Sequence, residues 1–285
     1  MQGSRWMKWF LPTAFSRYAP NITMFSTFQA VVLGAVQGLT EFLPVSSSAH
    51  LVLIPWIFGW QDPGLAFDVA LHLGTLVALI VYYWRQWLSM AASVVNGDAP
   101  QRRLLTLLII ASIPGAIIGL ALEKPAETLF REHKLWIGIA LGVLGIILWF
   151  VDKYRPKSRT IRELTVLDAV VIGLSQALAI FPGVSRSGAT ITMARLMGIE
   201  RQDAANFSFL MATPIIAGAG MVEGRKILHA GMTAQVGWGF IAAAVFGLIA
   251  IVGLVRFVKT RTYLPFAWYR VALAAVVIAL VVTRA

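Results

Sequence analysis

Long apolar runs separated by short polar stretches dominate this chain. Six of the runs come close to the roughly 20 residues that an α-helix needs to cross about 30 Å of hydrocarbon. They predict membrane-spanning helices at 65–84, 104–122, 135–151, 205–224, 236–256 and 266–283. The pattern therefore predicts an all-α polytopic integral membrane protein.

Two further apolar regions, 28–59 and 166–198, do not fit a single crossing. Each is too long, and each is interrupted near its middle by Pro, Gly and Ser, as LPVSSS and FPGVSRSG. Non-helical backbone at membrane depth is tolerated only where it is buried in protein or lines a wet cavity. We therefore predict two re-entrant hairpins, in which a helix enters the membrane, breaks and turns back.

The two interrupted regions resemble each other. With a shift of 139 residues, GAVQGLTEFLPVSSS (34–48) aligns without a gap with GLSQALAIFPGVSRS (173–187), and seven of fifteen positions are identical. The matches include Gly, Gln, Phe and paired Ser, which apolar composition alone does not explain. We interpret them as an internal duplication, with a first repeat at 24–151 and a second at 166–285. Each repeat has a hairpin and three spans, and this odd number inverts the second copy, as in many transporters.

Composition agrees with the membrane class. Hydrophobic residues make up 58% of the chain and charged residues 13%, against about 25% charged in soluble domains. The net charge of +11 comes from Lys and Arg between apolar runs, which favours membrane loops over a nucleic-acid partner. The absence of Cys excludes disulfides and thiolate metal sites. Residues 1–23 lack a signal-peptide pattern and are treated as an interfacial or non-native extension.

The distribution of basic residues predicts an orientation. Thirteen Lys and Arg lie in the predicted loops 85–103, 152–163, 195–203 and 256–261. Five lie in the opposite set, 60–64, 123–134 and 225–235. Because basic loops face the cytoplasm, the first hairpin is expected to enter from the outer side and the second from the inner side.

Hairpins that enter from opposite faces can bring their polar tips together. The first tip carries Glu41, Ser46, Ser47, Ser48 and His50, and the second carries Gly183, Ser185, Arg186, Ser187 and Thr190. A charge at mid-membrane costs on the order of 3 kcal/mol, so Glu41 and Arg186 need partners or water. A bare salt bridge is one explanation, but the surrounding hydroxyls and imidazole favour a composite site. Substrate-binding candidates are Gln37, Ser46, Gly183, Ser185, Ser187 and Thr190.

The residue types favour phosphate chemistry. A Gly-flanked, hydroxyl-rich loop at a helix end, with Arg186 beside it, is suited to hold phosphate oxygens. Gln37 and Glu41 lie four residues apart on one helix face and could bind a divalent cation with help from phosphate. Gln37 is a weak ligand, however, so Glu41 could act as a base instead.

The remaining roles stay open at this stage. Ser47 could be a nucleophile with Glu41 or His50 as its base, or a water could attack. His50 could be a general acid or base, or a structural core histidine. At least two of the serines are expected only to cap helices. Asp68 and His72, four residues apart on one face of the first span, could line the same cavity or stabilise it, and a supporting position is favoured.

Two motifs carry a resemblance to a known family. QGLTE (37–41), running into FLPVSSSAH, and PGVSRSGAT (182–190) resemble the undecaprenyl-pyrophosphate phosphatase family of bacterial inner membranes, also called the bacitracin-resistance family. AFDVALHLGTLVAL (66–79) and FSFLMATPIIAGA (207–219) are similar to it as well. The resemblance covers essentially Met24 to the C-terminus, and the second motif is specific when it is paired with the first.

The resemblance implies ten helices, with two re-entrant pairs and six spans. It implies hydrolysis of undecaprenyl pyrophosphate to the monophosphate carrier and inorganic phosphate, which recycles the carrier for cell-wall synthesis and confers bacitracin resistance. The implied catalytic residues are Glu41, Ser47, His50 and Arg186, with Gln37 in place of the first-motif acid. A divalent cation, Mg²⁺ or Ca²⁺, and a periplasm-facing site are also implied.

A second class of function stays open from the architecture. Inverted repeats suit a secondary transporter or flippase of an anion or of the polyprenyl-phosphate carrier equally well. The paired motifs rank the phosphatase first. Membrane lipid is an expected partner in either case, and a homodimer is left open.

Overall fold

The computed structural model describes residues 25–155, 158–230 and 233–284, with the backbone alone at 123–132, 223 and 225–230. The described residues form helices and contain no β-strand. The first half comprises α1 (Thr27–Phe42), α2 (Ser47–Phe58), α3 (Leu65–Asn96), α4 (Ala99–Glu132) and α5 (Lys134–Tyr154). The second comprises the 3-10 turn η4 (Ile161–Glu163), α6 (Val166–Ala177), the 3-10 turn η5 (Leu178–Ile180), α7 (Arg186–Leu196), α8 (Arg201–Ala230), α9 (Ala234–Phe257) and α10 (Leu264–Arg284).

Six of the described helices are long and apolar enough to cross a membrane. They are α3, α4, α5, α8, α9 and α10. Two pairs of shorter helices, α1 with α2 and α6 with α7, precede them in the two halves of the chain. The prediction of an all-α polytopic membrane protein is confirmed.

The predicted loop at 85–103 is wrong, because most of it is helical. Helix α3 continues to Asn96, and Gly97 ends it with a left-handed φ of 77°. No Pro or Gly lies between Trp84 and Asn96, so nothing in that segment stops the helix. Only Tyr83 departs from helical geometry, with φ −101° and ψ 15°, and marks a kink. Helices α4 and α8 likewise extend into the predicted loops 123–134 and 225–235.

The breaks inside the short helix pairs have local causes. Pro44 favours extended backbone at the residue before it, and Leu43 ends α1 with φ −65° and ψ 140°. Ser46 and Ser185 then cap α2 and α7 with positive φ values of 75° and 72°. Among the described residues these are the only non-glycine residues with positive φ. Backbone strain of this kind tends to occur at functional sites.

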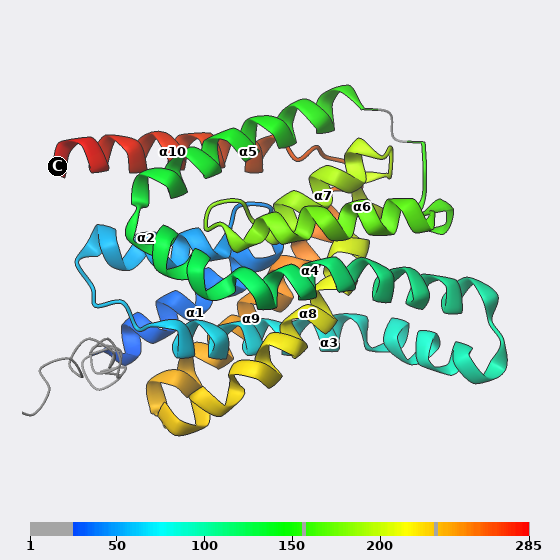
Figure 1. Ribbon diagram of the computed structural model, residues 1–285, viewed down its shortest axis with the longest axis horizontal. Coiled ribbons are helices and arrows are strands. Elements are labelled where there is room, and N and C mark those ends of the chain that lie inside the picture. Colours follow the sequence, from blue (N-terminus) through cyan, green and yellow to red (C-terminus); the bar gives the residue numbers. More distant parts are fainter. Residues whose placement is uncertain (1–24, 156–157, 231–232, 285) are drawn as a thin grey trace, which may run out of the picture.

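Each short helix pair packs on a long helix of the other half. Helix α1 lies against α9, where a Cβ on Gly34 would be 2.2 Å from the Gly239 carbonyl oxygen. Helix α6 lies against α4, where a Cβ on Gly173 would be 2.2 Å from the Ala111 carbonyl oxygen. Gly34 and Gly173 are equivalent positions of the repeated sequence. The same glycine-dependent contact thus brings both loops toward the centre of the helical bundle (Figure 1).

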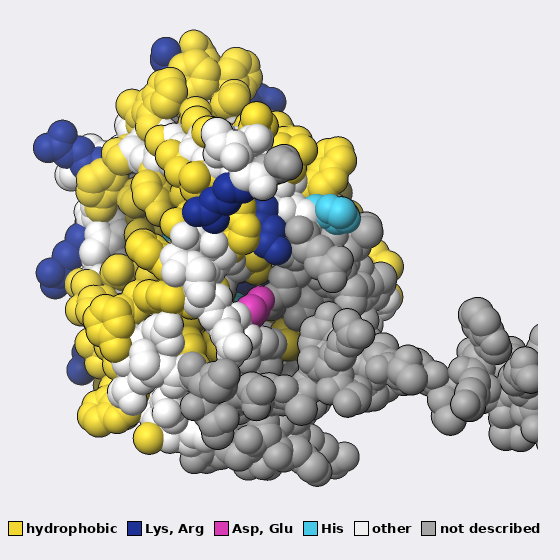
Figure 2. Space-filling model, turned by 90° about the vertical axis from the view of Figure 1, so that its left-hand side faces the viewer, with side chains coloured by type: hydrophobic (Ala, Val, Ile, Leu, Met, Phe, Trp, Pro, Cys, Tyr) yellow, Lys and Arg dark blue, Asp and Glu magenta, His cyan; other side chains and the backbone are white. Residues whose placement is uncertain are grey.

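The outside of the bundle is largely apolar, as expected for helices that face lipid. Large side chains such as Ile117, Phe150 and Trp268 are more than half exposed. Figure 2 views the end of the molecule where α10 finishes, and hydrophobic side chains cover much of that face. An acidic group is visible near the centre of the view, with basic side chains above it.

Candidate active site

The two broken loops are joined directly to each other. The Ser46 hydroxyl accepts a hydrogen bond from the Gly183 backbone N–H, with N and O 3.2 Å apart. The Ser187 hydroxyl donates to the Leu43 carbonyl oxygen at 3.1 Å. Because each bond runs from one loop to the other, the loops form a single unit. The two tips are therefore in direct contact, as the sequence predicts.

Arg270 of α10 holds this unit together through hydrogen bonds to both loops. It is fully buried, at 0% exposure. Its guanidinium donates to the carbonyl oxygens of Pro44 (3.1 Å) in the first loop and of Gly183 (2.8 Å) and Val184 (3.0 Å) in the second. A fourth bond runs from Nε to the Leu141 carbonyl of α5 at 3.1 Å. Sequence analysis missed Arg270, although an arginine inside a membrane span is itself a signal.

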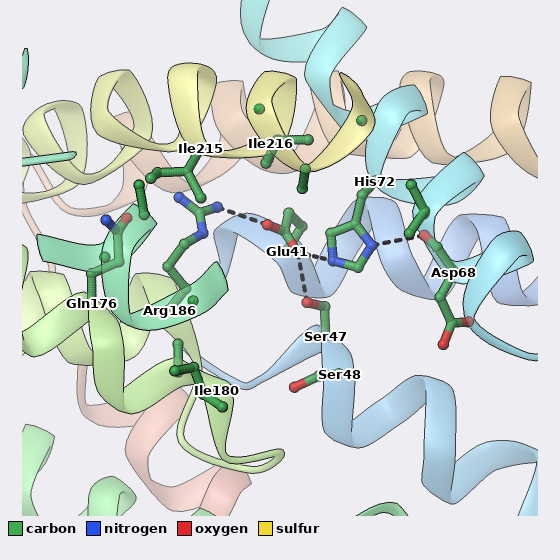
Figure 3. Close-up of a pocket in the computed structure, with 18 of the residues that line it drawn as sticks. Glu41, Ser47, Ser48, Asp68, His72, Gln176, Ile180, Arg186, Ile215 and Ile216 are labelled. Atoms are coloured by element: carbon green, nitrogen blue, oxygen red, sulfur yellow. Dashed lines mark hydrogen bonds and ion pairs between the residues drawn. The ribbon is translucent and has the colours of Figure 1, made fainter. Parts of the chain in front are cut away.

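Glu41 is the centre of the polar site, and Figure 3 shows it beside Ser47, His72 and Arg186. Its Oε1 accepts from Arg186 Nη2 at 2.7 Å. Its Oε2 accepts from the Ser47 hydroxyl at 2.6 Å and from the Gln37 amide nitrogen at 3.0 Å. The Nε2 atom of His72 lies 3.5 Å from the same Oε2. A carboxylate that is 5% exposed is thus held by four groups from four elements.

Four of these residues, Glu41, Ser47, His72 and Arg186, line a cavity of about 550 Å³. Its polar lining comprises Glu41, Ser47, Ser48, Asp68, His72, Gln176, Ser185 and Arg186. Its apolar lining includes Leu51, Val52, Leu65, Val69, Leu120, Ile180, Ile215, Ile216, Met221 and Val222. Leu120 and Met221 are 67% and 78% exposed on the outside of the bundle. The cavity thus combines a charged part, around Glu41 and Arg186, with apolar walls that reach the lipid-facing surface.

The two histidines differ in their relation to the cavity, and each position matches an alternative left open by the sequence. His50 is not among the side chains that line the cavity. Its Nδ1 bonds to the Ser46 carbonyl at 2.7 Å and its Nε2 to the Tyr269 hydroxyl at 2.6 Å, so both nitrogens are engaged. His72 does line the cavity, and its Nδ1 bonds to the Asp68 carbonyl at 2.7 Å. The imidazole that faces the cavity is therefore that of His72.

The other candidate residues mainly shape the two loops. Ser46 and Ser185 accept from the backbone N–H groups of Ala49 and Gly188 and so cap α2 and α7. Gly183 has a φ of 98°, which favours glycine. Thr190 is fully buried and bonds to the Ser208 hydroxyl at 2.7 Å. Of these residues only Ser185 reaches the cavity wall.

The donor set alone does not fit a divalent cation. Among the described residues, no group of three His, Asp or Glu side chains is placed to hold a metal. Both oxygens of Glu41 already accept hydrogen bonds, and Gln37 turns its amide N–H toward Glu41. Mg²⁺ needs near-octahedral oxygen ligands and commonly takes several from substrate phosphate and water. A cation at Glu41 and Gln37 would depend on such outside ligands.

The arrangement suits attack on a phosphorus atom. The Ser47 hydroxyl donates to a carboxylate, as a serine nucleophile does to its base. Arg186 lies on the other side of that carboxylate, and its guanidinium can hold phosphate oxygens in pairs. The apolar walls can accommodate a hydrocarbon chain beside this charged part. Together these features fit an amphiphilic phosphate ester.

Comparison with known proteins agrees with this chemistry. Residues 30–276 match the family described as "Bacitracin resistance protein BacA". An "Undecaprenyl-diphosphatase" of Moorella thermoacetica is 49% identical over 256 residues, which cover 89% of this chain and 97% of the relative. One of Desulforudis audaxviator is 48% identical over 258 residues, covering 90% and 98%, and one of Pelotomaculum thermopropionicum is 46% identical over 260, covering 91% and 98%. The resemblance seen in the two motifs is confirmed, and the chain belongs to the bacitracin resistance protein BacA family.

Proposed function

We propose that this chain is an integral membrane phosphatase that hydrolyses undecaprenyl diphosphate to undecaprenyl phosphate and inorganic phosphate. The observation that carries the proposal is the Ser47–Glu41–Arg186 cluster in the charged part of an apolar-walled cavity. The substrate has the matching form, with a charged diphosphate on a long hydrocarbon chain. The names of the relatives support the same reaction.

In the proposed first step, the Ser47 oxygen attacks the terminal phosphorus. Glu41 takes the hydroxyl proton, for which its Oε2 is 2.6 Å from the Ser47 oxygen. The bond from the terminal phosphorus to the bridging oxygen breaks, and undecaprenyl phosphate leaves with the proton from Glu41. Phosphoryl transfer depends mainly on positioning and charge stabilisation, which Arg186 supplies.

In the second step, water hydrolyses the phosphoserine. Glu41 takes a proton from the attacking water, the phosphorus–oxygen bond to Ser47 breaks, and the proton returns to the serine oxygen. Inorganic phosphate is released and the site is restored. Direct attack by water on the diphosphate is the alternative, with Glu41 as the base in the same position.

Phosphate release by purified protein in detergent micelles tests the function. We expect turnover by the wild type and losses of at least about 100-fold in kcat for Glu41→Gln, Ser47→Ala and Arg186→Ala, because each removes a group acting on the reacting atoms. Substantial turnover by Arg186→Ala would contradict the assignment. A Ser47→Ala protein that keeps near wild-type kcat would favour water as the nucleophile. A pure transporter or flippase would release no phosphate at all.

The cation requirement remains a prediction for Glu41 and Gln37. Turnover with and without EDTA, followed by addition of Mg²⁺ or Ca²⁺, measures it.

His50 as a catalytic group also remains a prediction. Because both of its nitrogens are engaged by Ser46 and Tyr269, loss of stability in a His50→Ala protein would indicate a structural contribution.

We further propose a location in the bacterial inner membrane with the cavity open to the periplasm. Leu65, Leu120 and Val222, which line the cavity, adjoin the predicted loops that are poor in Lys and Arg. Since the chain lacks cysteine, a single Leu65→Cys variant can be labelled in intact cells with a membrane-impermeant thiol reagent. Labelling only after the cells are opened would contradict this orientation. Light scattering in detergent tests the homodimer.

A further inference from the structure

Gln176 is a buried amide that no step of the proposed mechanism uses. It lies near the C-terminal end of α6, is 4% exposed and lines the cavity. Neither its Nε2 nor its Oε1 has a hydrogen-bond partner within the described part of the chain. Buried amide atoms are nearly always hydrogen-bonded, because leaving them unpaired is unfavourable. An unpaired amide that faces a cavity therefore points to a ligand.

A second unpaired donor lies on the same cavity. The Nη1 atom of Arg186 is buried and also lacks a partner within the described residues, whereas its Nη2 holds Glu41. In Figure 3, Glu41 lies on one side of the Arg186 guanidinium and Gln176 on the other. One edge of the guanidinium thus faces the part of the cavity that contains Ser47, and the other edge faces the part that contains Gln176.

On the side of α4 the Gln176 amide lies directly against Gly115. A Cβ on Gly115 of α4 would lie 2.3 Å from Gln176 Nε2, so a side chain there would displace the amide. In the repeated sequence Gln176 is the counterpart of Gln37, but the position matching Glu41 is Ile180. Gln37 donates to its carboxylate, and Gln176 has none to donate to. An anionic oxygen of a ligand would take the place of that carboxylate.

We infer that Gln176 Nε2 and Arg186 Nη1 form a subsite for the lipid-linked phosphate of a polyprenyl diphosphate. The inference rests on the proposed function. Ser47 attacks the terminal phosphorus on the Glu41 side, so the second phosphoryl group, one bridging oxygen away, extends to the other edge of the guanidinium. There the amide N–H and the free guanidinium edge donate to its oxygens, and Oε1 accepts from a water or a protonated phosphate oxygen.

Gln176→Leu tests this subsite in purified protein. We expect KM for the polyprenyl diphosphate to rise about tenfold or more with little change in kcat, because a contact made equally in the ground and transition states is lost. Inhibition by polyprenyl monophosphate should weaken by a similar factor, while inhibition by inorganic phosphate stays unchanged. The melting temperature should stay level or rise, because leucine leaves no buried amide unpaired.

Gly115→Ala provides a second test that keeps the glutamine in the chain. Its Cβ should push the amide aside and reproduce the rise in KM. Gly253→Ala, at a helical glycine with open space around its Cβ position, is the matched control. Gln101→Leu is the control for the amide, since Gln101 bonds to Gln86 outside the cavity. Both controls should keep wild-type kinetics.

The outcomes separate this inference from the proposed function. If the wild type releases no phosphate, the proposed function fails. If the wild type is active but Gln176→Leu and Gly115→Ala keep its KM, the inference is overturned. It is also overturned if only inhibition by inorganic phosphate weakens, because the amide would then bind the terminal phosphate. A lower melting temperature with unchanged kinetics would show a purely structural amide.

Discussion

Arg270 offers the sharpest test of how the site is built. It binds three loop carbonyls, two of one loop and one of the other, and so adds to the direct hydrogen bonds between the loops. Arg270→Met keeps a long apolar side chain in the same space but removes every donor. Arg270→Lys keeps the charge but loses the planar fork that lets one side chain reach several carbonyls. The two variants separate the effect of charge from that of geometry.

The size of the effect follows from the bonds that are lost. A buried group left without its hydrogen bond costs about 1–3 kcal/mol, and carbonyl oxygens are the more tolerant groups. Removing the buried charge also recovers part of its desolvation cost. We therefore take the lower end, about 1 kcal/mol, for each of the four carbonyls that lose Arg270, a loss of about 4 kcal/mol for Arg270→Met. At about 2–4 °C per kcal/mol that corresponds to a drop in Tm of about 8–16 °C.

The assay combines thermal unfolding in detergent with phosphate release. We expect Arg270→Met to lower Tm by the amount above and to lower kcat, since only the direct hydrogen bonds between the Ser47 and Arg186 loops then hold them together. Arg270→Lys should fall between Arg270→Met and the wild type in both measurements. Arg284→Met is the control on the same helix, because Arg284 is exposed and bonds to the Trp56 and Ile57 carbonyls. It should leave kcat unchanged.

One result would refute the reasoning. If Arg270→Met melts at the wild-type temperature and turns over at the wild-type rate, the two loops do not depend on this side chain. A loss of stability with unchanged kcat would limit Arg270 to a role in folding. A loss of kcat at wild-type stability would show that it positions the loops without contributing to stability.

Two further perturbations test other parts of the fold. Asp152 accepts hydrogen bonds from Arg195 at 3.0 Å and from Arg201 at 2.7 Å, so Asp152→Asn should lower the free energy of unfolding by about 3 kcal/mol. Thermal unfolding measures this loss, and an unchanged Tm would mean that the two arginines find other partners. Gly34→Val should force α1 away from the Gly239 carbonyl and lower the free energy of unfolding by about 1–3 kcal/mol or more. Thermal unfolding measures this loss as well, and a wild-type Tm would contradict the close contact between the helices.

Local pattern was sufficient for the fold class and for the positions of the breaks. Apolar runs of membrane-spanning length can be recognised within a short window of the sequence. Pro44 ends α1 because its ring disfavours helical backbone at the preceding residue, Leu43. Helix ends were predicted less well. Helix α3 runs past 84 to Asn96 because polar residues at the membrane surface do not stop a helix unless a breaker is present.

The candidate site was predictable where a charged residue lies in an otherwise apolar segment. Glu41 and Arg186 are conspicuous in apolar segments, and the structure joins them at 2.7 Å. From the residues alone His50 was left open between a catalytic and a structural role, and the family resemblance implied the catalytic one, whereas a supporting position was favoured for His72. The structure instead turns His50 to Tyr269, a residue 219 positions away, and places His72 beside Glu41.

The sequence by itself determined the membrane class, the two broken helix pairs and the charged residues at their tips, because hydropathy and helix-breaking act between near neighbours. Tertiary structure alone decided which imidazole faces the cavity and that Arg270 binds both loops from 226 positions beyond Pro44. It also decided that Gln176 faces the cavity without a hydrogen-bond partner in the described part of the chain. Those outcomes depend on which helices pack together. Gly34 and Gly173 permit that packing through close backbone contacts, whose partners far along the chain no local pattern specifies.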